Sequence, residues 1–459
     1  DSDIHVETYT DSQNRTNSAG FIGNLAGKSN VEYVFAAGTV NNKTEKELYN
    51  FLGTPNVLET MVNHAFIIEN AGGKSNITDT TGERLVTVTV DQTKQTDFYR
   101  TSMNLSEETW NLSLVGMKGY PELLGMEKME VISVSTAKDF LKMKDFPTQE
   151  YHLEADIDLS DVEQTEALIP QFSGVLDGKN HTVTGLKVPL FGQMNGKVSN
   201  LAIANNQLEV NMDTEAGVFA NQMTSAAVEK VLIYNSKINN TAGKAAGFVG
   251  TINNSTLKNI FVHGEVHAKS MASGFVLNAN GSTIENIYTN VQANGTEGAG
   301  FVVSSTGETT YKNICSVGDV SANMYKLSKD ITQITNGYEF AAANGMASSE
   351  ENSSIKNIGK EVWTKDFYTT TLGLNSEVWD TEQADTNGYP SLKGFTVKTE
   401  PMRVEIHRPD DVQKINKVPE GKFVLTADLN FEGTDNSLVT ETFTGILNGD
   451  NHAVSGINS

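Results

Sequence analysis

The stretch AGFVGTINNSTLKNIFVHGEV, residues 246–266, determines how this chain is expected to fold. A small residue and a glycine precede an apolar pair, a polar turn, a short apolar run containing an asparagine, and a second turn and strand. The same order of residue types recurs in residues 19–40, 216–238, 273–293 and 299–320. The central copies lie 26 to 30 residues apart. A fixed period of this length is typical of proteins built from stacked repeats.

A single repeat is too small to fold by itself. Burial of its few large apolar side chains contributes roughly 12–24 kcal/mol, whereas ordering its backbone costs roughly 1–2 kcal/mol per residue. Neighbouring repeats must therefore share an apolar face and backbone hydrogen bonds. The apolar runs are short and bounded by Gly, Asn, Ser and Thr, which indicates strands rather than helices. The expected fold is all-β: right-handed parallel β-helix modules in tandem, with short capping helices.

An asparagine occupies the same place in successive repeats, at Asn259, Asn286 and Asn313. Asn200 and Asn357 hold this place in outlying copies. Stacked amides can hydrogen-bond along the repeat axis as a ladder. Alternatively, each asparagine simply suits a tight turn. Both interpretations are compatible with stacked coils.

These copies resemble the GLUG repeat of bacterial surface proteins. Residues 246–250 with 257–260 match its small-Gly-aromatic start and its aliphatic-x-Asn-aliphatic middle, whereas Lys230 replaces the asparagine in one copy. Such repeats occur in the β-helical N-terminal region of streptococcal immunoglobulin-A-cleaving zinc metallopeptidases. The resemblance implies a virulence-associated protein of Gram-positive bacteria, secreted or displayed on the cell surface.

The composition restricts the partners of the chain. A net charge of -23 over 459 residues argues against a nucleic-acid partner and against an anionic membrane surface. No apolar run is long enough to span a membrane. The single cysteine, Cys315, lies in an apolar strand and is expected to be a small buried side chain. Neither a signal peptide nor a sorting signal is recognisable, so we interpret the chain as a piece of a longer protein.

Three pairs of segments match at an offset of about 270 residues: 98–125 with 367–394, 150–160 with 422–432, and 172–186 with 443–457. We therefore predict the C-terminal part of one module in residues 1–126 and a complete module in residues 127–399. Residues 400–459 are predicted to be the N-terminal part of a following module. Adjacent modules of the same chain are then partners of one another.

The first pair of segments, residues 98–125 and 367–394, carries a tryptophan followed by Gly-Tyr-Pro. A large apolar side chain and a rigid turn suit a lid over the open end of a coil. The alternative is a platform for stacking carbohydrate rings, formed by Trp110, Tyr120, Trp379 and Tyr389.

Two short helices are expected near the starts of modules. Residues 133–143 read as a helix with Ser135 as N-cap, and residues 408–418 as a helix with Pro409 in its first turn. Such a helix can close the first coil by covering an otherwise open sheet edge.

The motif HGEVH, with His263, Glu265 and His267, is the nearest approach to a metal site. On a strand the three side chains point the same way, but alternate residues are nearly 7 Å apart. That spacing is wide for ligands about 2 Å from one ion. An exposed polar face of a coil is the favoured interpretation. The zinc-peptidase motif H-E-x-x-H is absent from the sequence.

Other polar candidates are interpreted as structural. His181 and His452 share an L-x-G-x-x-H setting that indicates a tight turn after Asp177 or Asn448. Asp156 and Asp158 in one copy become Asp428 and Asn430 in the other, which weakens a paired-acid or calcium site. We therefore predict no catalytic, cofactor-binding or metal-binding residues in this segment, and no cofactor.

Three functions remain open. The main hypothesis is a non-catalytic extracellular scaffold, a stalk or adhesin at the bacterial cell surface, in contact with a host glycoprotein or a neighbouring surface protein. The second is the substrate-recognition region of a secreted zinc metallopeptidase. The third is a β-helix enzyme that degrades polysaccharide, which the scarce and scattered Lys and Arg residues disfavour.

Overall fold

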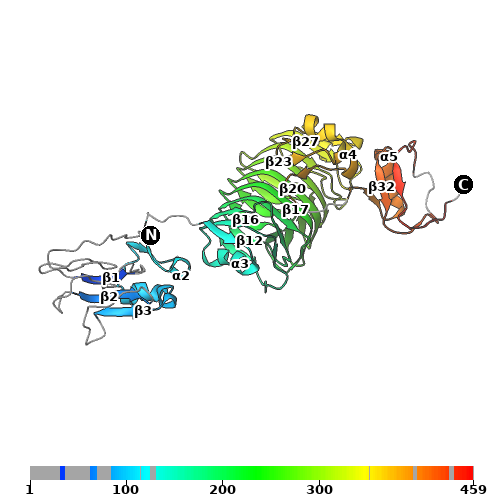
Figure 1. The fold of residues 1–459 in the computed structure, drawn as a ribbon. Helices are drawn as coiled ribbons and strands as arrows, with labels where there is room; N and C mark the ends of the chain where they lie inside the picture. Colours follow the sequence, from blue (N-terminus) through cyan, green and yellow to red (C-terminus); the bar gives the residue numbers. More distant parts are fainter. Residues whose placement is uncertain are drawn as a thin grey trace. The chain divides into compact units, whose positions relative to one another are not determined.

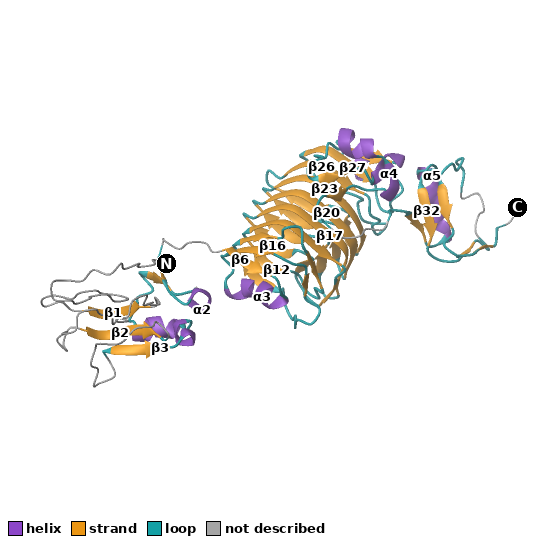
Figure 2. Ribbon diagram, in the orientation of Figure 1, coloured by secondary structure: helices purple, strands orange, loops and turns teal. Residues whose placement is uncertain are grey.

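The computed structural model describes residues 31–36, 62–69, 84–113, 115–124, 131–350, 352–395, 401–433 and 439–457 (Figures 1 and 2). The chain divides into two compact units, Asp1–Met129 and Glu130–Ser459, and each is described by itself. Strand residues far outnumber helical residues in the described structure, and the strands pair largely in parallel. The module division at residues 126 and 399 stays a prediction, and most of the 19–40 copy lies outside the described residues.

A large parallel sheet runs through the second unit. Its main path has the order β28-β27-β26-β23-β20-β17-β13-β10-β7-β6, with β8, β11 and β14 attached beside it. The strands are β6 (Val131–Val134), β7 (Glu150–Leu153), β8 (Ile157–Asp158), β10 (Val175–Asp177), β11 (Thr182–Thr184), β13 (Lys197–Ala204), β14 (Gln207–Val210), β17 (Ala227–Asn240), β20 (Thr256–Ala268), β23 (Thr283–Asn294), β26 (Thr310–Ser316), β27 (Ile334–Phe340) and β28 (Ile355–Ile358).

Two smaller parallel sheets complete the walls. The first contains β9 (Ile169–Phe172), β12 (Phe191–Met194), β16 (Ala220–Thr224), β19 (Val249–Asn253), β22 (Val276–Asn280) and β25 (Val302–Thr306). The second contains β15 (Glu215–Gly217), β18 (Lys244–Ala246), β21 (Met271–Ser273) and β24 (Glu297–Ala299).

The chain visits these three sheets in a fixed order. It passes through β16, β17 and β18, and then through β19, β20 and β21 in the same sheets. Val231 lies opposite Ile260, which lies opposite Ile287, so paired residues are 29 and 27 positions apart. The sequence period is therefore the distance along the chain between neighbouring parallel strands. Figure 1 shows these strands stacked from β12 to β27.

The asparagine ladder is present. Asn259, Asn286 and Asn313 have left-handed backbone angles, with φ of 54°, 59° and 57°. The amide of Asn286 donates to Asn259 Oδ1 over 3.1 Å, and that of Asn313 donates to Asn286 Oδ1 over 2.8 Å. Thus the turn conformation and the ladder occur together. Asn336 continues the ladder by donating to Asn313 over 3.0 Å. Asn357 lies opposite Glu339 rather than Asn336, so the prediction for Asn357 was wrong.

Residues of the large sheet alternate between two apolar layers. Val231, Ile260 and Ile287 belong to the buried cluster enclosed by the three sheets. Their neighbours Leu232, Phe261 and Tyr288 lie in a second cluster on the outer face of the sheet. The outer cluster also contains Trp363, Trp379 and Tyr389, which come from residues 360–395.

Residues 360–395 cover the outer face of the sheet. They form η3 (Lys360–Trp363), η4 (Phe367–Thr371), β29 (Trp379–Asp380), α4 (Ala384–Asn387) and β30 (Ser391–Leu392). Trp379 Nε1 donates to Oδ1 of Asn259 in β20 over 3.0 Å. Strand β20 lies in the middle of the sheet order, so the expected lid over an open coil end was wrong. The segment packs on the side because the outer face presents apolar side chains that need cover.

A helix closes the start of the second unit, as predicted. The helix α3 (Ala137–Asp145) buries Phe140 and Met143 in the inner cluster. Its N-cap is Thr136, whose hydroxyl accepts from the Asp139 amide over 3.1 Å, and not Ser135. Among the described residues, no helix has the length and apolar character needed to cross a membrane.

The C-terminal segment begins a similar arrangement. It contains β31 (Val404–Ile406), η5 (Pro409–Gln413), α5 (Lys414–Lys417), β32 (Lys422–Leu425), β33 (Leu429–Asn430), β34 (Ile446–Asn448) and β35 (Val454–Ser455). The helix expected over 408–418 is split into a 3-10 turn and a short α-helix, with Pro409 in the first turn. A further 3-10 turn, η2 (Ser348–Glu350), precedes β28.

The first unit repeats the end of the second. Its parallel strands β1 (Val31–Ala36), β2 (Val62–Ile68) and β3 (Leu85–Val88) precede α1 (Val90–Thr93), η1 (Phe98–Ser102), β4 (Trp110–Asn111), α2 (Val115–Lys118) and β5 (Glu122–Leu123). Tyr99 Oη donates to the carbonyl of Gly119 over 2.5 Å, as Tyr368 Oη does to that of Gly388 over 3.4 Å. The duplication read from the sequence is therefore a duplication of structure.

Candidate functional site

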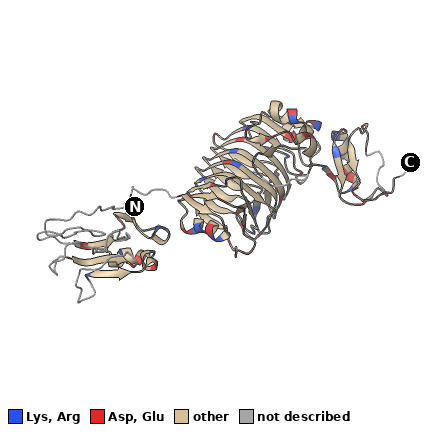
Figure 3. Ribbon diagram, in the orientation of Figure 1, with Lys and Arg blue, Asp and Glu red and all other residues tan. Residues whose placement is uncertain are grey.

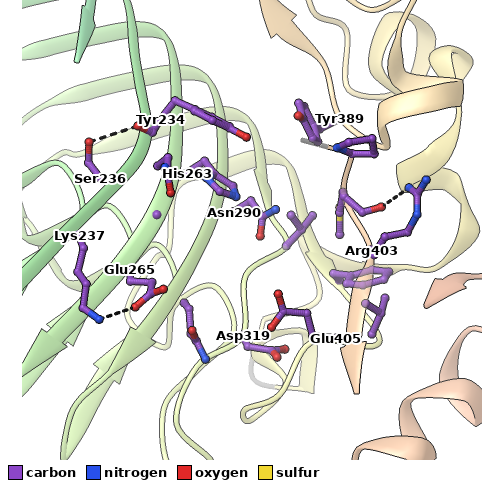
Figure 4. A pocket seen from close by; sticks show the side chains of 18 of the residues that line it. Tyr234, Ser236, Lys237, His263, Glu265, Asn290, Asp319, Tyr389, Arg403 and Glu405 are labelled. Atoms are coloured by element: carbon purple, nitrogen blue, oxygen red, sulfur yellow. Dashed lines mark hydrogen bonds and ion pairs between the residues drawn. The ribbon is translucent and has the colours of Figure 1, made fainter. Parts of the chain in front are cut away.

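One cleft of the second unit has a volume of about 530 Å³. One wall is the outer face of β17, β20 and β23, and the other includes residues 401–405 (Figure 4). Figure 4 shows Tyr234, His263 and Asn290 on the sheet side, facing Tyr389 and Arg403. A cavity of this size can hold a small ligand or part of a larger one.

The sheet wall becomes polar along each strand. On β20 the outer face carries the buried Phe261 and then His263 and Glu265, which line the cleft. On β23 it carries Tyr288, followed by Asn290 and Gln292 in the cleft. Since His263 lies opposite Asn290 in the strand register, each strand contributes to the same polar strip. Residues 360–395 cover the apolar part, and the polar strip lines the cleft.

His263 is a largely enclosed ionisable group of the sheet wall, beside the buried Tyr234. Its ring stacks on Tyr234 with centroids 4.7 Å apart, and its Nδ1 atom is buried without a hydrogen-bond partner in the described structure. Burial lowers the pKa of His263 to about 4, so the ring is neutral at physiological pH. The expectation of an exposed face was wrong for this residue, because Tyr234 and the opposite wall enclose it.

Glu265 and His267 do lie on a more exposed part of the strand. Lys237 Nζ is 3.0 Å from Glu265 Oε2, and His267 Nε2 is 3.2 Å from the same atom. Partial burial raises the pKa of Glu265, but the hydrogen bonds and charges of Lys237 and His267 lower it more. His267 does not line the cleft. Within the described ranges, no group of three His, Cys, Asp or Glu side chains has an arrangement that could hold a metal ion.

The far side of the cleft adds charges of both signs. Arg403 and Glu405 come from the segment around β31, and Asp319 follows β26. Lys414 Nζ is 2.8 Å from Asp319 Oδ2 and donates to the Glu405 carbonyl over 3.2 Å. This pair fastens the C-terminal segment to the end of β26 and completes the cleft.

The predicted structural residues make structural contacts. Asp156 Oδ1 accepts from the Thr182 amide over 2.9 Å and lies 3.2 Å from His181 Nδ1. Asp428 repeats this, with the Ala453 amide at 2.8 Å and His452 Nδ1 at 3.3 Å. Each aspartate therefore fixes the strand that follows the turn.

Asp158 and Asn430 also have equivalent contacts. Asp158 Oδ1 accepts from the Ser160 amide, and Asn430 Oδ1 accepts from the Glu432 amide, both over 2.9 Å. This bond needs an oxygen but no charge, which explains why aspartate and asparagine can replace each other here.

The aromatic platform is not formed in the second unit. Trp379 and Tyr389 are 0 % and 2 % exposed, so neither ring face is open to a carbohydrate. In the first unit, Trp110 is half-buried and Tyr120 is exposed. Cys315 is buried as predicted, and burial raises the pKa of its thiol.

Lys237 and Gln292 of the cleft were not identified from the sequence, whereas their neighbour Glu265 was named there. Lys237, Glu265 and Gln292 occupy matching register positions in three successive strands. An alignment of the repeats beyond their marker glycines would have placed these three side chains in one row. No such signal exists for Arg403 and Glu405, which reach the cleft from outside the repeats. Figure 3 shows basic and acidic positions interspersed over the unit rather than gathered by sign.

Comparisons with known proteins give limited matches. Residues 136–235 match the family model for the N-terminal region of M26 IgA1-specific metallo-endopeptidases. No curated protein sequence matches the chain. A proposed immunoglobulin A1 protease from Bacteroides ovatus has a TM-score of 0.42 and 16% identity, covering 58% of this chain and 92% of that one. A structure named IgA1 protease has a TM-score of 0.40 and 15% identity over 52% of this chain and 22% of its own length.

Proposed function

We propose that this chain is part of the N-terminal region of a secreted IgA1-protease-like metallopeptidase and that it holds the protein substrate. The match of residues 136–235 to that region carries the proposal. The matched residues include α3, which closes the second unit, and Tyr234 of the cleft. In this role the chain lies outside the cell and binds its partner without cleaving it.

The architecture that suits this role is a right-handed parallel β-helix. The fixed order of three sheets and the parallel register of β17, β20 and β23 support it. Crossovers between parallel strands are almost always right-handed. Such a column is rigid because each circuit is paired on both sides, so it can hold a large substrate at a fixed distance from a catalytic domain.

The absence of H-E-x-x-H from the sequence leads us to place catalysis elsewhere in the parent protein. The charges of the cleft support a binding role. Lys237 pairs with Glu265, and Lys414 pairs with Asp319, so each of these carboxylates is already neutralised by a cation. A general acid or base would need a carboxylate with a raised pKa, whereas the pKa of Glu265 is lowered.

The test is binding of human immunoglobulin A1 to the full chain by surface plasmon resonance, with immunoglobulin G as the negative control. We expect binding of immunoglobulin A1 and no proteolysis during a parallel overnight incubation. Glu405→Lys, an exposed charge reversal in the cleft, should weaken binding. Glu432→Lys, an equally exposed reversal outside the cleft lining, should not. Absence of binding, or cleavage by the chain alone, contradicts the proposal.

The duplicated closing segments favour a second candidate, a passive extracellular stalk. Tyr99–Gly119 and Tyr368–Gly388 make the same hydrogen bond, as expected for modules that serve as spacers. A stalk predicts no binding of immunoglobulin A1 by wild type and no difference between the two charge reversals. The same experiment therefore separates the two candidates.

A further inference from the structure

The sheet wall of the cleft presents carboxamide side chains that have no partner. Gln207 of β14 and Asn290 and Gln292 of β23 line the cleft. In the part of the chain that the structure describes, the amides of these three residues make no hydrogen bond to another side chain or to the backbone. Each amide offers two N–H donors and a carbonyl acceptor. The wall can therefore both donate and accept at several points along one strip.

The cleft has no excess of either charge. Its carboxylates Glu265, Asp319 and Glu405 are matched by Lys237, Arg403 and the bound Lys414. His263 adds no charge, because burial lowers its pKa to about 4. Lys237 and Lys414 are held in ion pairs, so a phosphate, sulfate or acidic sugar would have to bind Arg403 in a cleft that also contains three carboxylates. The charge balance therefore favours an uncharged ligand.

The cleft offers an extended peptide few free main-chain groups. On the sheet wall, β17 and β23 pair with β20, β14 pairs with β17 on its other side, and the Ala293 amide of β23 donates to the Asp319 carbonyl. On the opposite wall, β31 pairs with β32 on one side, and on the other side the Glu405 carbonyl already accepts from Lys414 Nζ. An added peptide strand needs an edge with several unpaired main-chain groups. Side chains are therefore expected to make most of the contacts.

From these three observations we infer that the cleft binds a neutral, hydroxyl-rich ligand, a short uncharged oligosaccharide. Hydroxyl groups both donate and accept hydrogen bonds, which matches the carboxamides of Gln207, Asn290 and Gln292. This inference goes beyond substrate holding, because the ligand is a free saccharide and its binding does not depend on immunoglobulin A1.

The experiment is saturation-transfer NMR of the full chain with lactose, cellobiose and N-acetylgalactosamine, alongside glucuronic acid and an uncharged Ser–Ala peptide. We expect saturation transfer to at least one neutral saccharide and none to the acid or the peptide. The double variant Asn290→Ala/Gln292→Ala should raise the dissociation constant about tenfold, since it removes two hydrogen-bonding groups. Gln222→Ala, an exposed glutamine on β16 outside the cleft, is the matched control and should bind like wild type.

Circular dichroism checks that each variant is folded. If the double variant does not fold, Gln292→Glu keeps the side-chain size and adds a carboxylate, and it should weaken binding to a similar degree. The inference is overturned if no neutral saccharide binds, if the cleft variants bind like wild type, or if the acid or the peptide binds better. Saccharide binding without immunoglobulin A1 binding would support the cleft assignment and contradict only the proposed function.

Discussion

Residues 172–186 and 443–457 have closely related sequences but opposite environments. Leu176 and Leu186 in the first segment are 0 % and 1 % exposed. Their counterparts Leu447 and Ile457 are 45 % and 68 % exposed. The difference arises because β13 pairs with both β10 and β11 in the first segment. In the described part of the second segment, β34 pairs with β32 alone and β35 with β33 alone.

The local conformation of the two segments is nevertheless the same. Lys179 and Asn180 have φ of 48° and 66°, and Asp450 and Asn451 have φ of 42° and 65°. The amide of the following histidine donates to the glycine carbonyl over 2.7 Å in one turn and 2.8 Å in the other. In a two-residue Asp-Gly or Asn-Gly turn, the glycine itself has a left-handed conformation. Here the two left-handed residues come after the glycine instead. The comparison shows that the local sequence determines the turn. Burial of the apolar side chains beside it depends on pairing with the next parallel strand.

The largest expected difference is between Leu176→Ala and Leu447→Ala. Leu176→Ala should lower the free energy of unfolding of the second unit by about 3 kcal/mol, because it leaves a cavity in a packed core. Leu447→Ala should lower it by no more than about 1 kcal/mol, since surface substitutions have small effects. Urea unfolding of the full chain, monitored by circular dichroism and by hydrogen exchange of peptides from each segment, measures both. Equal losses of unfolding free energy in the two variants would contradict the role assigned to the neighbouring parallel strand.

An intermediate difference is expected between Gly178→Ala and Gly449→Ala. A Cβ at Gly178 would lie 2.4 Å from the Asn200 carbonyl oxygen of the neighbouring strand, whereas a Cβ at Gly449 meets nothing within 4 Å. The first substitution should destabilise by about 1–3 kcal/mol through forced backbone shifts, and the second should stay within about 0.5 kcal/mol. Thermal melts of the two variants test this. A large effect at Gly449 would show that the turn itself, rather than its neighbour, rejects a side chain.

The smallest expected effect is that of Asp177→Asn, which gives the first segment the residue found at Asn448. Partial burial raises the pKa of Asp177, but hydrogen bonds from Asn200 and Lys179 lower it more, so it lies below the usual 3.8. The charged form thus stabilises the fold above pH 3.8, and this contribution is lost as the pH falls through the lowered pKa. Asp177→Asn should cost about 1 kcal/mol or less at pH 7.

The wild-type protein and Asp177→Asn should therefore converge in stability as the pH falls below 3.8. Urea titrations at pH 7 and at pH 3 measure the convergence. Asn448→Asp is the reciprocal control, and it should change stability little at either pH because Asn448 is exposed. A constant gap between wild type and Asp177→Asn would assign the effect to packing rather than to charge.

Much of the repeat architecture could be predicted from the sequence. The spacing of Gly247 and Gly274 equals the strand register, that of Gly217 and Gly247 differs from it by one residue, and the asparagines of successive copies form the ladder. The helix α3 and the duplicated closing segments were also predicted. These features depend on contacts between adjacent repeats or within one segment, and such contacts leave a periodic pattern in the sequence.

The cleft could not be predicted in the same way. His263 and Glu265 were recognised as neighbours on one strand, but the enclosure of His263 depends on the opposite wall. Trp379 was expected at a coil end and instead bonds to Asn259, 120 residues earlier in the chain. No local pattern records which of several apolar faces a distant segment will cover.

By itself, the sequence determined the parallel repeat, its period, the left-handed turns and the two copies of each end segment. These features follow from the backbone preferences of particular residue types and from contacts between adjacent repeats, which act over one or two repeats only. Only the tertiary structure decided that residues 360–395 cover the side of the sheet and that residues 401–405 form a cleft with it. The reason is that burial of an apolar face is non-directional, so it selects a partner by fit in three dimensions rather than by position in the chain.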